Sequence, residues 1–205
     1  MRPTPPHWIK APGPAAGLRI GLLGGSFDPA HGGHLYVSEV ARKALKLDYV
    51  WWLVSPGNPL KHDPAPLKVR TARARLVARG SRFLVTDIEE RLHTRFTVDT
   101  VNVLQHRFPH ASFVWLMGSD NLEQFSRWRR WQHLAALIPI AVVRRPGSVF
   151  ANLHAPLAQR LGVARRLGSA PSLVVLDGPR SRESSTELRA LALGAGVEAM
   201  VNLTT

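Results

Sequence analysis

Six short apolar runs, separated by longer stretches that include helical patterns, limit the folds open to this chain more than any other feature. The runs are Arg19–Leu23, Tyr49–Val54, Arg82–Val85, Ser112–Met117, Ile140–Val143 and Leu173–Leu176. They are apolar almost without interruption, which is typical of strands that are covered on both faces in a parallel sheet. The alternation predicts an α/β fold, a Rossmann-like, doubly wound and mostly parallel sheet with helices on both faces.

Helical periodicity occupies several of the intervals between these runs. After the first run, apolar residues recur at helical spacing and form one stripe, which consists of Val37, Val40, Ala41, Ala44 and Leu45. Two further helices are predicted over 97–108, with Val98, Val101, Leu104 and Phe108 inward, and over 130–137. Proteins of this architecture bind ligands at the carboxyl ends of the strands, so the functional residues are expected there.

A chain of 205 residues is long enough for one α/β domain with a substantial core. The first 17 residues contain five prolines and no apolar period, which predicts a tail over 1–17 and a single domain over 18–205. No run approaches the roughly 18 apolar residues of a membrane span, and the N-terminus lacks the pattern of a signal peptide. These features predict a cytoplasmic protein with no membrane partner.

The balance of charge points to an anionic ligand. The 27 Lys and Arg residues exceed the 14 Asp and Glu residues by 13, which favours either a nucleotide or a nucleic acid. The basic residues are scattered rather than gathered in a block, which favours a solvated surface over a nucleic-acid interface. The chain has no cysteine, so disulfides, thiolate zinc sites and a cysteine nucleophile are excluded. Any metal would be held by oxygen or imidazole, or would arrive with the substrate.

The strongest motif lies between the first run and the first helix and reads Gly-Gly-Ser-Phe-Asp-Pro-Ala-His-Gly-Gly-His. Glycines allow backbone N–H groups to approach a phosphate, and the helix that opens near His31 adds unpaired N–H donors. Phosphoryl transfer needs mainly positioning and charge stabilisation, which two imidazoles can supply. The alternative is that the histidines only cap and pack. The candidate phosphate-binding residues of this segment are Gly24, Gly25, Ser26, Phe27, His31 and His34.

The string Gly-Ser-Phe-Asp-Pro-x-His-x-Gly-His resembles the H-x-G-H signature of the nucleotidyltransferase α/β phosphodiesterase superfamily. Its surroundings, from about Leu18 to the C-terminus, resemble the bacterial nicotinate-nucleotide adenylyltransferases. The resemblance implies transfer of the adenylyl group of ATP to nicotinate mononucleotide, which yields deamido-NAD and pyrophosphate in NAD biosynthesis, with Mg²⁺ accompanying ATP. No carboxylate cluster in the sequence makes a dedicated metal cage, so no resident metal site is expected. The oligomeric state stays open, and a homo-oligomer is compatible with the sequence.

Two other functions stay open at this point. The same fold and chemistry would serve another acceptor, either nicotinamide mononucleotide or phosphopantetheine. A basic nucleic-acid-binding module is the alternative from a different class. The chain is short for a tRNA synthetase and lacks a clustered basic stripe or an RNA-reading motif, so no nucleic-acid partner is expected.

A second signature stands near the C-terminus, where Ser-Ser-Thr-Glu-Leu-Arg resembles the Ile-Ser-Ser-Thr-x-Ile-Arg of the family. Ser184 and Glu187 have the spacing of a capping box, so hydroxyls and N–H donors collect at a helix start, which suits phosphate. An ordinary helix cap is the alternative. Glu183 departs from the family, which usually has an apolar residue there. The resemblance assigns phosphate contacts to Ser184, Ser185, Thr186 and Arg189.

The acceptor site is implied by Phe-Thr-Val-Asp-Thr and a later tryptophan, which resemble the Ser-Tyr-Thr-x-x-Thr and tryptophan of the family. By this resemblance, the N–H of Thr97 takes the nicotinate carboxylate and Trp128 stacks on the pyridine ring. A helix start favours a carboxylate over a carboxamide, which predicts selection of nicotinate. Core packing is the alternative for Trp128. Phe96 replaces the tyrosine of the family.

The remaining contacts come from three loops at strand ends. Asp120, in Gly-Ser-Asp-Asn-Leu, resembles the aspartate whose segment lies against adenosine, and a helix N-cap is its alternative. Arg144 directly follows the fifth run, where it can hold a triphosphate or stand as a solvated charge. Asn58 and Lys61 lie in a loop that resembles one contacting both substrates, with Leu60 in place of a histidine. The residues expected to act on the transferring group are His31, His34, Lys61 and Arg189.

Overall fold

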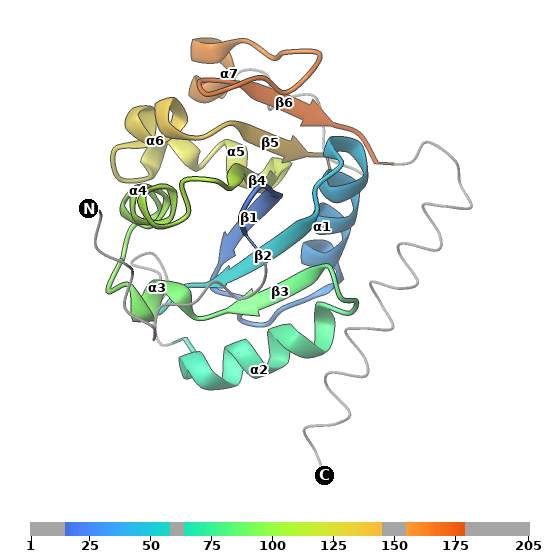
Figure 1. The fold of residues 1–205 in the computed structure, drawn as a ribbon, viewed down its shortest axis with the longest axis vertical. Coiled ribbons are helices and arrows are strands. Elements are labelled where there is room, and N and C mark those ends of the chain that lie inside the picture. The colour runs from blue at the N-terminus through green and yellow to red at the C-terminus, as the bar shows by residue number, and fades with distance from the viewer. Residues whose placement is uncertain (1–14, 58–63, 145–154, 179–205) are drawn as a thin grey trace.

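The computed structural model describes residues 15–57, 64–144 and 155–178, and its centre is one parallel sheet (Figure 1). The strands are β1 (Arg19–Gly25), β2 (Tyr49–Val54), β3 (Phe83–Thr86), β4 (Ser112–Gly118), β5 (Ile140–Val143) and β6 (Leu173–Leu176). Their order is β3-β2-β1-β4-β5-β6, and every neighbouring pair is parallel. Each predicted run is a strand, and the doubly wound fold is confirmed.

Helices cover both faces of this sheet. They are α1 (Gly32–Leu45), α2 (Leu67–Val77), α3 (Ile88–Arg91), α4 (Thr97–Arg107), α5 (Ser119–Leu122), the 3-10 turn η1 (Phe125–Arg127), α6 (Trp131–Leu137) and α7 (Pro156–Leu161). Helices α1 and α2 lie on one face, and α4, α6 and α7 lie on the other (Figure 1). Within the described ranges, no helix has the length and apolar character that crossing a membrane requires.

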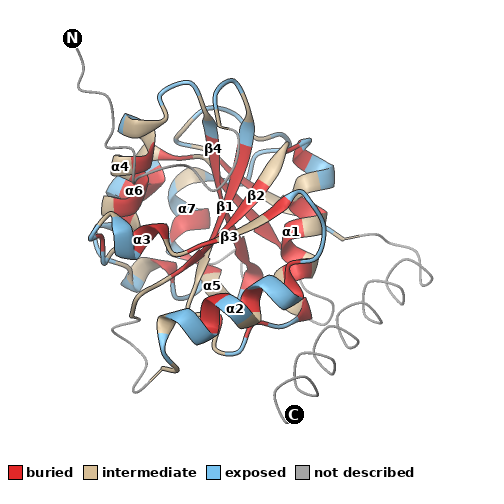
Figure 2. Ribbon diagram, turned by 60° about the horizontal axis from the view of Figure 1, so that its bottom comes forward, coloured by how far each residue is buried: buried red, intermediate tan, exposed pale blue. Residues whose placement is uncertain are grey.

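Two apolar layers flank the strands, and Figure 2 shows the strands largely buried while the outer sides of the helices are exposed. Successive side chains of a strand point to opposite faces, so β2 contributes one tryptophan to each layer. Trp51 packs in the layer beneath α4, and Trp52 packs in the layer beneath α1. Both are 0% exposed, which makes them comparable in burial but different in surroundings.

Most residues that are predicted to face the core from the helices are buried. The inward residues of α4 are buried as predicted at Val98, Val101 and Leu104, whereas Phe108 is a half-buried cap residue. Along α1 the predicted stripe is also buried, except that the prediction for Ala44 was wrong. Ala44 is exposed because only Leu45 reaches the core in the last turn.

Helix α2 was not predicted, because its buried face does not look apolar in the sequence. That face consists of Arg70, Thr71, Ala74 and Val77. Val69 and Leu76 point away from the core and are 37% and 47% exposed, so apolar periodicity gives the wrong face or none.

The beginning of the domain lies close to its predicted boundary. Ala15 and Leu18 pack against the core, and the backbone N–H of Gly17 donates to the carbonyl of His110 at 2.7 Å. Residues 1–14 lie outside the described part of the chain, so the tail over 1–17 stays a prediction.

Candidate active site

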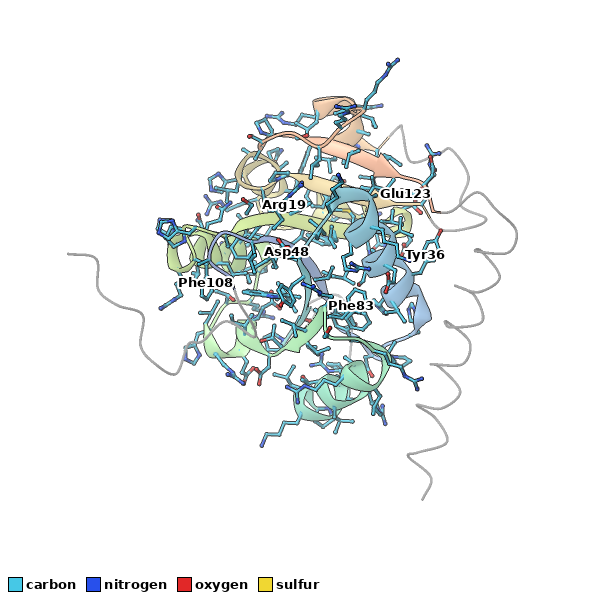
Figure 3. The ribbon with its side chains drawn as sticks, turned by 45° about the vertical axis from the view of Figure 1, so that its right-hand side comes forward. Arg19, Tyr36, Asp48, Phe83, Phe108 and Glu123 are labelled. Carbon is cyan, nitrogen blue, oxygen red and sulfur yellow. The ribbon has the colours of Figure 1, made fainter. Side chains whose placement is uncertain are left out.

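The two edges of the sheet differ in character. At the amino edge, Arg19 and Asp48 lie side by side at the starts of β1 and β2 (Figure 3). The backbone N–H of Arg19 donates to a carboxylate oxygen of Asp48 at 2.9 Å, and the Arg82 guanidinium donates to the Asp48 carbonyl at 3.5 Å. Hydrogen bonds thus tie neighbouring strands together at this edge. The glycine-histidine segment 24–34 follows β1 at the other edge.

At the carboxyl edge, the pairing between β1 and β4 stops before either strand ends. Their last paired residues are Leu23 and Leu116, whereas β1 stays paired with β2 as far as Gly25 and β4 stays paired with β5 as far as Gly118. The strand order also reverses at this point of the sheet. Doubly wound folds bind ligands in the crevice that forms at such a reversal.

The sequence predicts that Gly24 and Gly25 lie in the loop after the first strand. In the structure they form the end of β1, because β2 pairs with both. A Cβ atom on Gly24 would lie 2.5 Å from Cη2 of Trp115, closer than side chains tolerate. Close packing on a tryptophan ring therefore requires glycine at this position. Phosphate contact through the backbone of these two residues stays a prediction.

Helix α1 begins at Gly32, and its two histidines cap it reciprocally. Nδ1 of His31 accepts from the N–H of Gly33 at 3.1 Å, and the N–H of His31 donates to Nδ1 of His34 at 3.2 Å. The proposed alternative role, capping, is therefore real. Because both Nδ1 atoms act as acceptors, each neutral ring carries its proton on Nε2. Capping thus uses Nδ1 of each ring and fixes the orientation of both imidazoles.

Aromatic rings form the floor beneath these histidines. The ring centroids of His31 and His34 are 4.0 Å apart, and His34 lies 4.7 Å from Phe27. Phe27 in turn stacks on Trp52 at 5.0 Å with an interplanar angle of 11°. Phe27 is buried, His34 is half-buried and His31 is exposed, so the pair opens towards solvent from an apolar base.

Arg70 of α2 is a buried residue that the sequence analysis missed. It is 1% exposed, and its guanidinium donates to the carbonyls of Ala65, Ser26, Ser55 and Pro56 at 2.6, 2.7, 2.8 and 3.2 Å. Burial lowers the pKa of Arg70, although the Asp28 carboxylate partly offsets this effect. Helical spacing from Ala74 and Val77 places Arg70 on the same face of the helix as these two residues. A lone arginine in such a pattern usually faces solvent, so the sequence does not predict its burial.

The contact with Ser26 has a consequence for the phosphate-loop backbone. In a planar trans peptide, the carbonyl and the following N–H point in opposite directions. When Arg70 binds the Ser26 carbonyl, the N–H of Phe27 therefore points away from the guanidinium. Phe27 has φ of +48°, in the left-handed region that side chains rarely adopt, so this local conformation needs such support.

The two halves of the predicted acceptor site lie next to each other. Thr97 is the first residue of α4, as predicted, and Phe96 is its cap. The Arg129 guanidinium lies 4.8 Å above the Phe96 ring, which brings the residue after Trp128 to the start of α4. Trp128 is half-buried and contacts Trp115 edge to face at 5.9 Å. One side of Trp128 therefore packs on the core, and its stacking role stays a prediction.

A buried carboxyl group lies behind the start of α4. Glu89 is 7% exposed, and its Oε1 accepts a hydrogen bond from Oγ1 of Thr100 at 3.0 Å. Oγ1 of Thr94 lies 2.9 Å from the same oxygen of Thr100. Burial raises the pKa of Glu89 to about 7, and the hydrogen bond from Thr100 opposes the shift. Nothing in the sequence indicates that Glu89 is buried. Its neighbour Glu90 is the same residue type and is exposed.

Asp120 and Arg144 both follow strands at the carboxyl edge. Asp120 is the second residue of α5, whose cap is Gly118, so the N-cap alternative for Asp120 was wrong. The Arg144 guanidinium pairs with the Asp177 carboxylate at 2.9 Å, and both groups are partly exposed. Their contacts with ATP stay predictions.

Comparison with known proteins assigns the family. A probable nicotinate-nucleotide adenylyltransferase of Gluconobacter oxydans is 51% identical over 185 residues, which cover 84% of this chain and 94% of the relative. The chain belongs to the nicotinate-nucleotide adenylyltransferase family. A probable adenylyltransferase of the same name from Parvibaculum lavamentivorans is 49% identical over 184 residues, covering 84% of this chain and 92% of the relative. The family model described as Cytidylyltransferase-like matches residues 22–191.

A solved structure has the same fold. The nicotinic acid mononucleotide adenylyltransferase of Plasmodium falciparum, complexed with NaAD, matches with a TM-score of 0.61 at 15% identity. The match covers 82% of this chain and 79% of that chain. Membership of the nicotinate-nucleotide adenylyltransferase family confirms the resemblance and the enzyme class expected from the motifs.

Several predicted site residues lie outside the described residues, and their roles stay predictions. They are Asn58, Lys61, Ser184, Ser185, Thr186 and Arg189, together with the departures from the family at Leu60 and Glu183. In the described part of the chain, no group of three or more His, Cys, Asp or Glu residues could hold a metal ion.

The raised pKa of Glu89 makes folding depend on pH. A carboxyl group whose pKa is about 7 when folded and 4.5 when unfolded stabilises the fold fully below pH 4.5. That contribution to the free energy of unfolding is at most about 3 kcal/mol, and it is lost as the pH rises from 4.5 through 7. The Glu89→Gln variant should lack this loss, so its stability relative to wild type should increase between pH 5 and pH 8. Urea unfolding at four pH values measures the difference.

The matched control for this experiment is Glu90→Gln, which removes an exposed carboxyl group from the same turn. Its pH dependence should follow that of the wild type. Parallel stability curves for wild type and Glu89→Gln would show that Glu89 titrates alike in the folded and unfolded states.

Proposed function

We propose that this chain transfers the adenylyl group of ATP to nicotinate mononucleotide and releases pyrophosphate and deamido-NAD. The observation that carries the proposal is the His31–His34 pair at the start of α1, which follows β1 at the edge where its pairing with β4 ends. Both rings use Nδ1 to cap the helix and carry a proton on Nε2, so they suit the oxygens of a phosphate. The names of the family relatives support the same reaction.

In the proposed reaction, the 5′-phosphate oxygen of nicotinate mononucleotide attacks the α-phosphorus of ATP. A new phosphorus–oxygen bond forms as the bond to the bridging oxygen breaks, and its electron pair leaves with pyrophosphate. The Nε2–H groups of His31 and His34 stabilise the charge on the α-phosphate, together with the backbone N–H groups of 24–27. No covalent intermediate with the protein is needed, because phosphoryl transfer depends mainly on positioning and charge stabilisation.

The leaving pyrophosphate requires cationic and hydroxyl partners. We assign these to Lys61, Ser184, Ser185, Thr186 and Arg189, as the family motifs imply. Arg144 joins them by exchanging the Asp177 carboxylate for a phosphate oxygen. That exchange is inexpensive, since a solvent-exposed ion pair contributes only about 0–1 kcal/mol. Asp120 lies on the adenosine side.

The acceptor lies between α4 and the segment after η1. The N–H of Thr97 binds the nicotinate carboxylate, and Trp128 stacks on the pyridine ring, which adds about 0.5–1.5 kcal/mol beyond the buried area. The positive end of α4 favours a carboxylate over a carboxamide. Asn58 contributes from the loop after β2.

A divalent cation, Mg²⁺ in this proposal, travels with ATP. Two imidazoles, those of His31 and His34, stand at the described side of the site, and no group of three or more His, Cys, Asp or Glu residues in the described ranges could hold a metal ion. Bound to the triphosphate, Mg²⁺ neutralises part of its charge. The protein then needs to position the phosphates, and it does not need a metal site of its own.

Pyrophosphate release from Mg·ATP tests the proposal when nicotinate mononucleotide and nicotinamide mononucleotide are compared as acceptors. Nicotinate mononucleotide should be preferred by about tenfold or more in kcat/KM, because only its carboxylate gains a charged hydrogen bond. Preference for the amide would keep the chemistry and overturn the role of Thr97. No release with either acceptor would refute the proposed function, and phosphopantetheine would be the next acceptor to try.

A further inference from the structure

The neighbouring tryptophans of β2 differ in one hydrogen bond. Nε1 of Trp52 donates to Oγ of Ser38 at 2.8 Å, and Oγ of Ser38 donates to the carbonyl of His34 at 2.9 Å. Ser38 is 0% exposed. In the described part of the chain, Nε1 of Trp51 is buried and has no hydrogen-bond partner. A chain of two hydrogen bonds therefore runs from β2 to the backbone of His34 through the Trp52 side only.

A second path connects Trp52 to the ring of the same histidine. Trp52 stacks on Phe27, which contacts His34 at 4.7 Å. The rings of His34 and Trp52 are themselves 5.8 Å apart. Trp52 thus reaches the backbone of His34 through Ser38 and its ring through Phe27.

Ser38 is an unusual choice for a buried position inside a helix. A serine that bonds to the carbonyl four residues earlier competes with the helix and slightly destabilises it. Alanine would fill the position with a better helix propensity. The hydroxyl is explained by its second contact, because it gives the buried indole N–H of Trp52 an acceptor.

We propose that Trp52 and Ser38 are positioning residues for His34, which together fix the first turn of α1 and the imidazole ring above β2. This inference rests on the proposed function, in which Nε2 of His34 contacts the α-phosphate. Neither Trp52 nor Ser38 touches substrate in that mechanism. Their effect is geometric, since a displacement of about 1 Å at a reacting group can cost ~10²-fold in rate.

The test compares the steady-state kinetics of Trp52→Phe, Ser38→Ala and the double variant with those of Trp51→Phe. Trp51→Phe is a matched control, because it makes the same change one residue away at an equally buried site without an indole hydrogen bond. We expect kcat to fall about tenfold in Trp52→Phe and Ser38→Ala, with KM for both substrates within about twofold. Trp51→Phe should keep kcat within about twofold of wild type.

The double variant tests whether the two residues act as one unit. If they do, the kcat of the double variant should fall no further than that of the more impaired single variant. One broken hydrogen bond already disconnects Trp52 from the backbone of His34. Additive losses would overturn the linked role. So would losses in Trp52→Phe and Ser38→Ala that do not exceed the loss in Trp51→Phe, or a rise in KM at unchanged kcat. Ser38→Ala keeps the proposal testable if Trp52→Phe does not fold.

His34→Ala separates this inference from the proposed function. A wild-type kcat in His34→Ala would remove His34 from the mechanism, whatever the other variants do. A large loss in His34→Ala together with wild-type kcat in Ser38→Ala would leave the proposed function standing and overturn only the positioning role.

Discussion

Arg70→Met should lower the free energy of unfolding by about 3 kcal/mol or more, and adenylyl transfer should fall with it. Methionine has a similar length but no donor, so the four carbonyls that Arg70 binds lose their partner. A buried acceptor without a partner costs about 1–3 kcal/mol. Water can replace some of these bonds because the acceptors are only partly buried, which sets the lower end of the estimate.

The loss of activity has a separate cause from the loss of stability. The Ser26 carbonyl would no longer be bound, and the Phe27 conformation with φ of +48° would lose its support. The N–H of Phe27 would then have no defined direction towards a phosphate. We therefore expect kcat to fall even under conditions in which Arg70→Met remains folded.

Denaturant unfolding and steady-state kinetics measure both effects. Arg75→Met is the matched control, because Arg75 lies exposed on the same helix and should tolerate the change within about 0.5 kcal/mol. Arg70→Lys should fall between wild type and Arg70→Met, since one ammonium cannot reach four carbonyls. Equal stability of Arg70→Met and Arg75→Met would contradict the role of Arg70.

His34→Ala should reduce kcat by ~10²–10³, the usual cost of removing one preorganised donor from a developing charge. The KM for ATP should change much less, because the contact with the α-phosphate strengthens mainly in the transition state. The helix should lose about 1 kcal/mol of stability as well, since His34 also accepts the backbone N–H of His31.

Kinetic and unfolding measurements on the same preparation separate these two consequences. His133→Ala serves as the control, because His133 is exposed on α6 and is not one of the predicted site residues. Its kcat should match that of the wild type. A kcat of His34→Ala within about fivefold of wild type would mean that His34 caps the helix and does not act on the phosphate.

The sequence by itself determined the strands, the helices α1, α4 and α6, and the class of the fold. Apolar runs such as Tyr49–Val54 and Ile140–Val143 are strands with the predicted bounds, because buried parallel strands need continuous apolar residues. The first residue of α4 was also predicted, at Thr97. These features depend on neighbours within a few residues, so they can be read along the chain. The family motifs added the reaction.

The tertiary structure alone decided how the candidate site is supported. Arg70 binds the carbonyl of Ser26, 44 residues away, and Trp52 binds Ser38, 14 residues away, so neither contact has a local signature. Burial, not residue type, distinguishes Glu89 from Glu90 and raises the pKa of one of them. Whether a polar side chain is exposed or buried depends on which segments fold against it, and only the packed structure determines that.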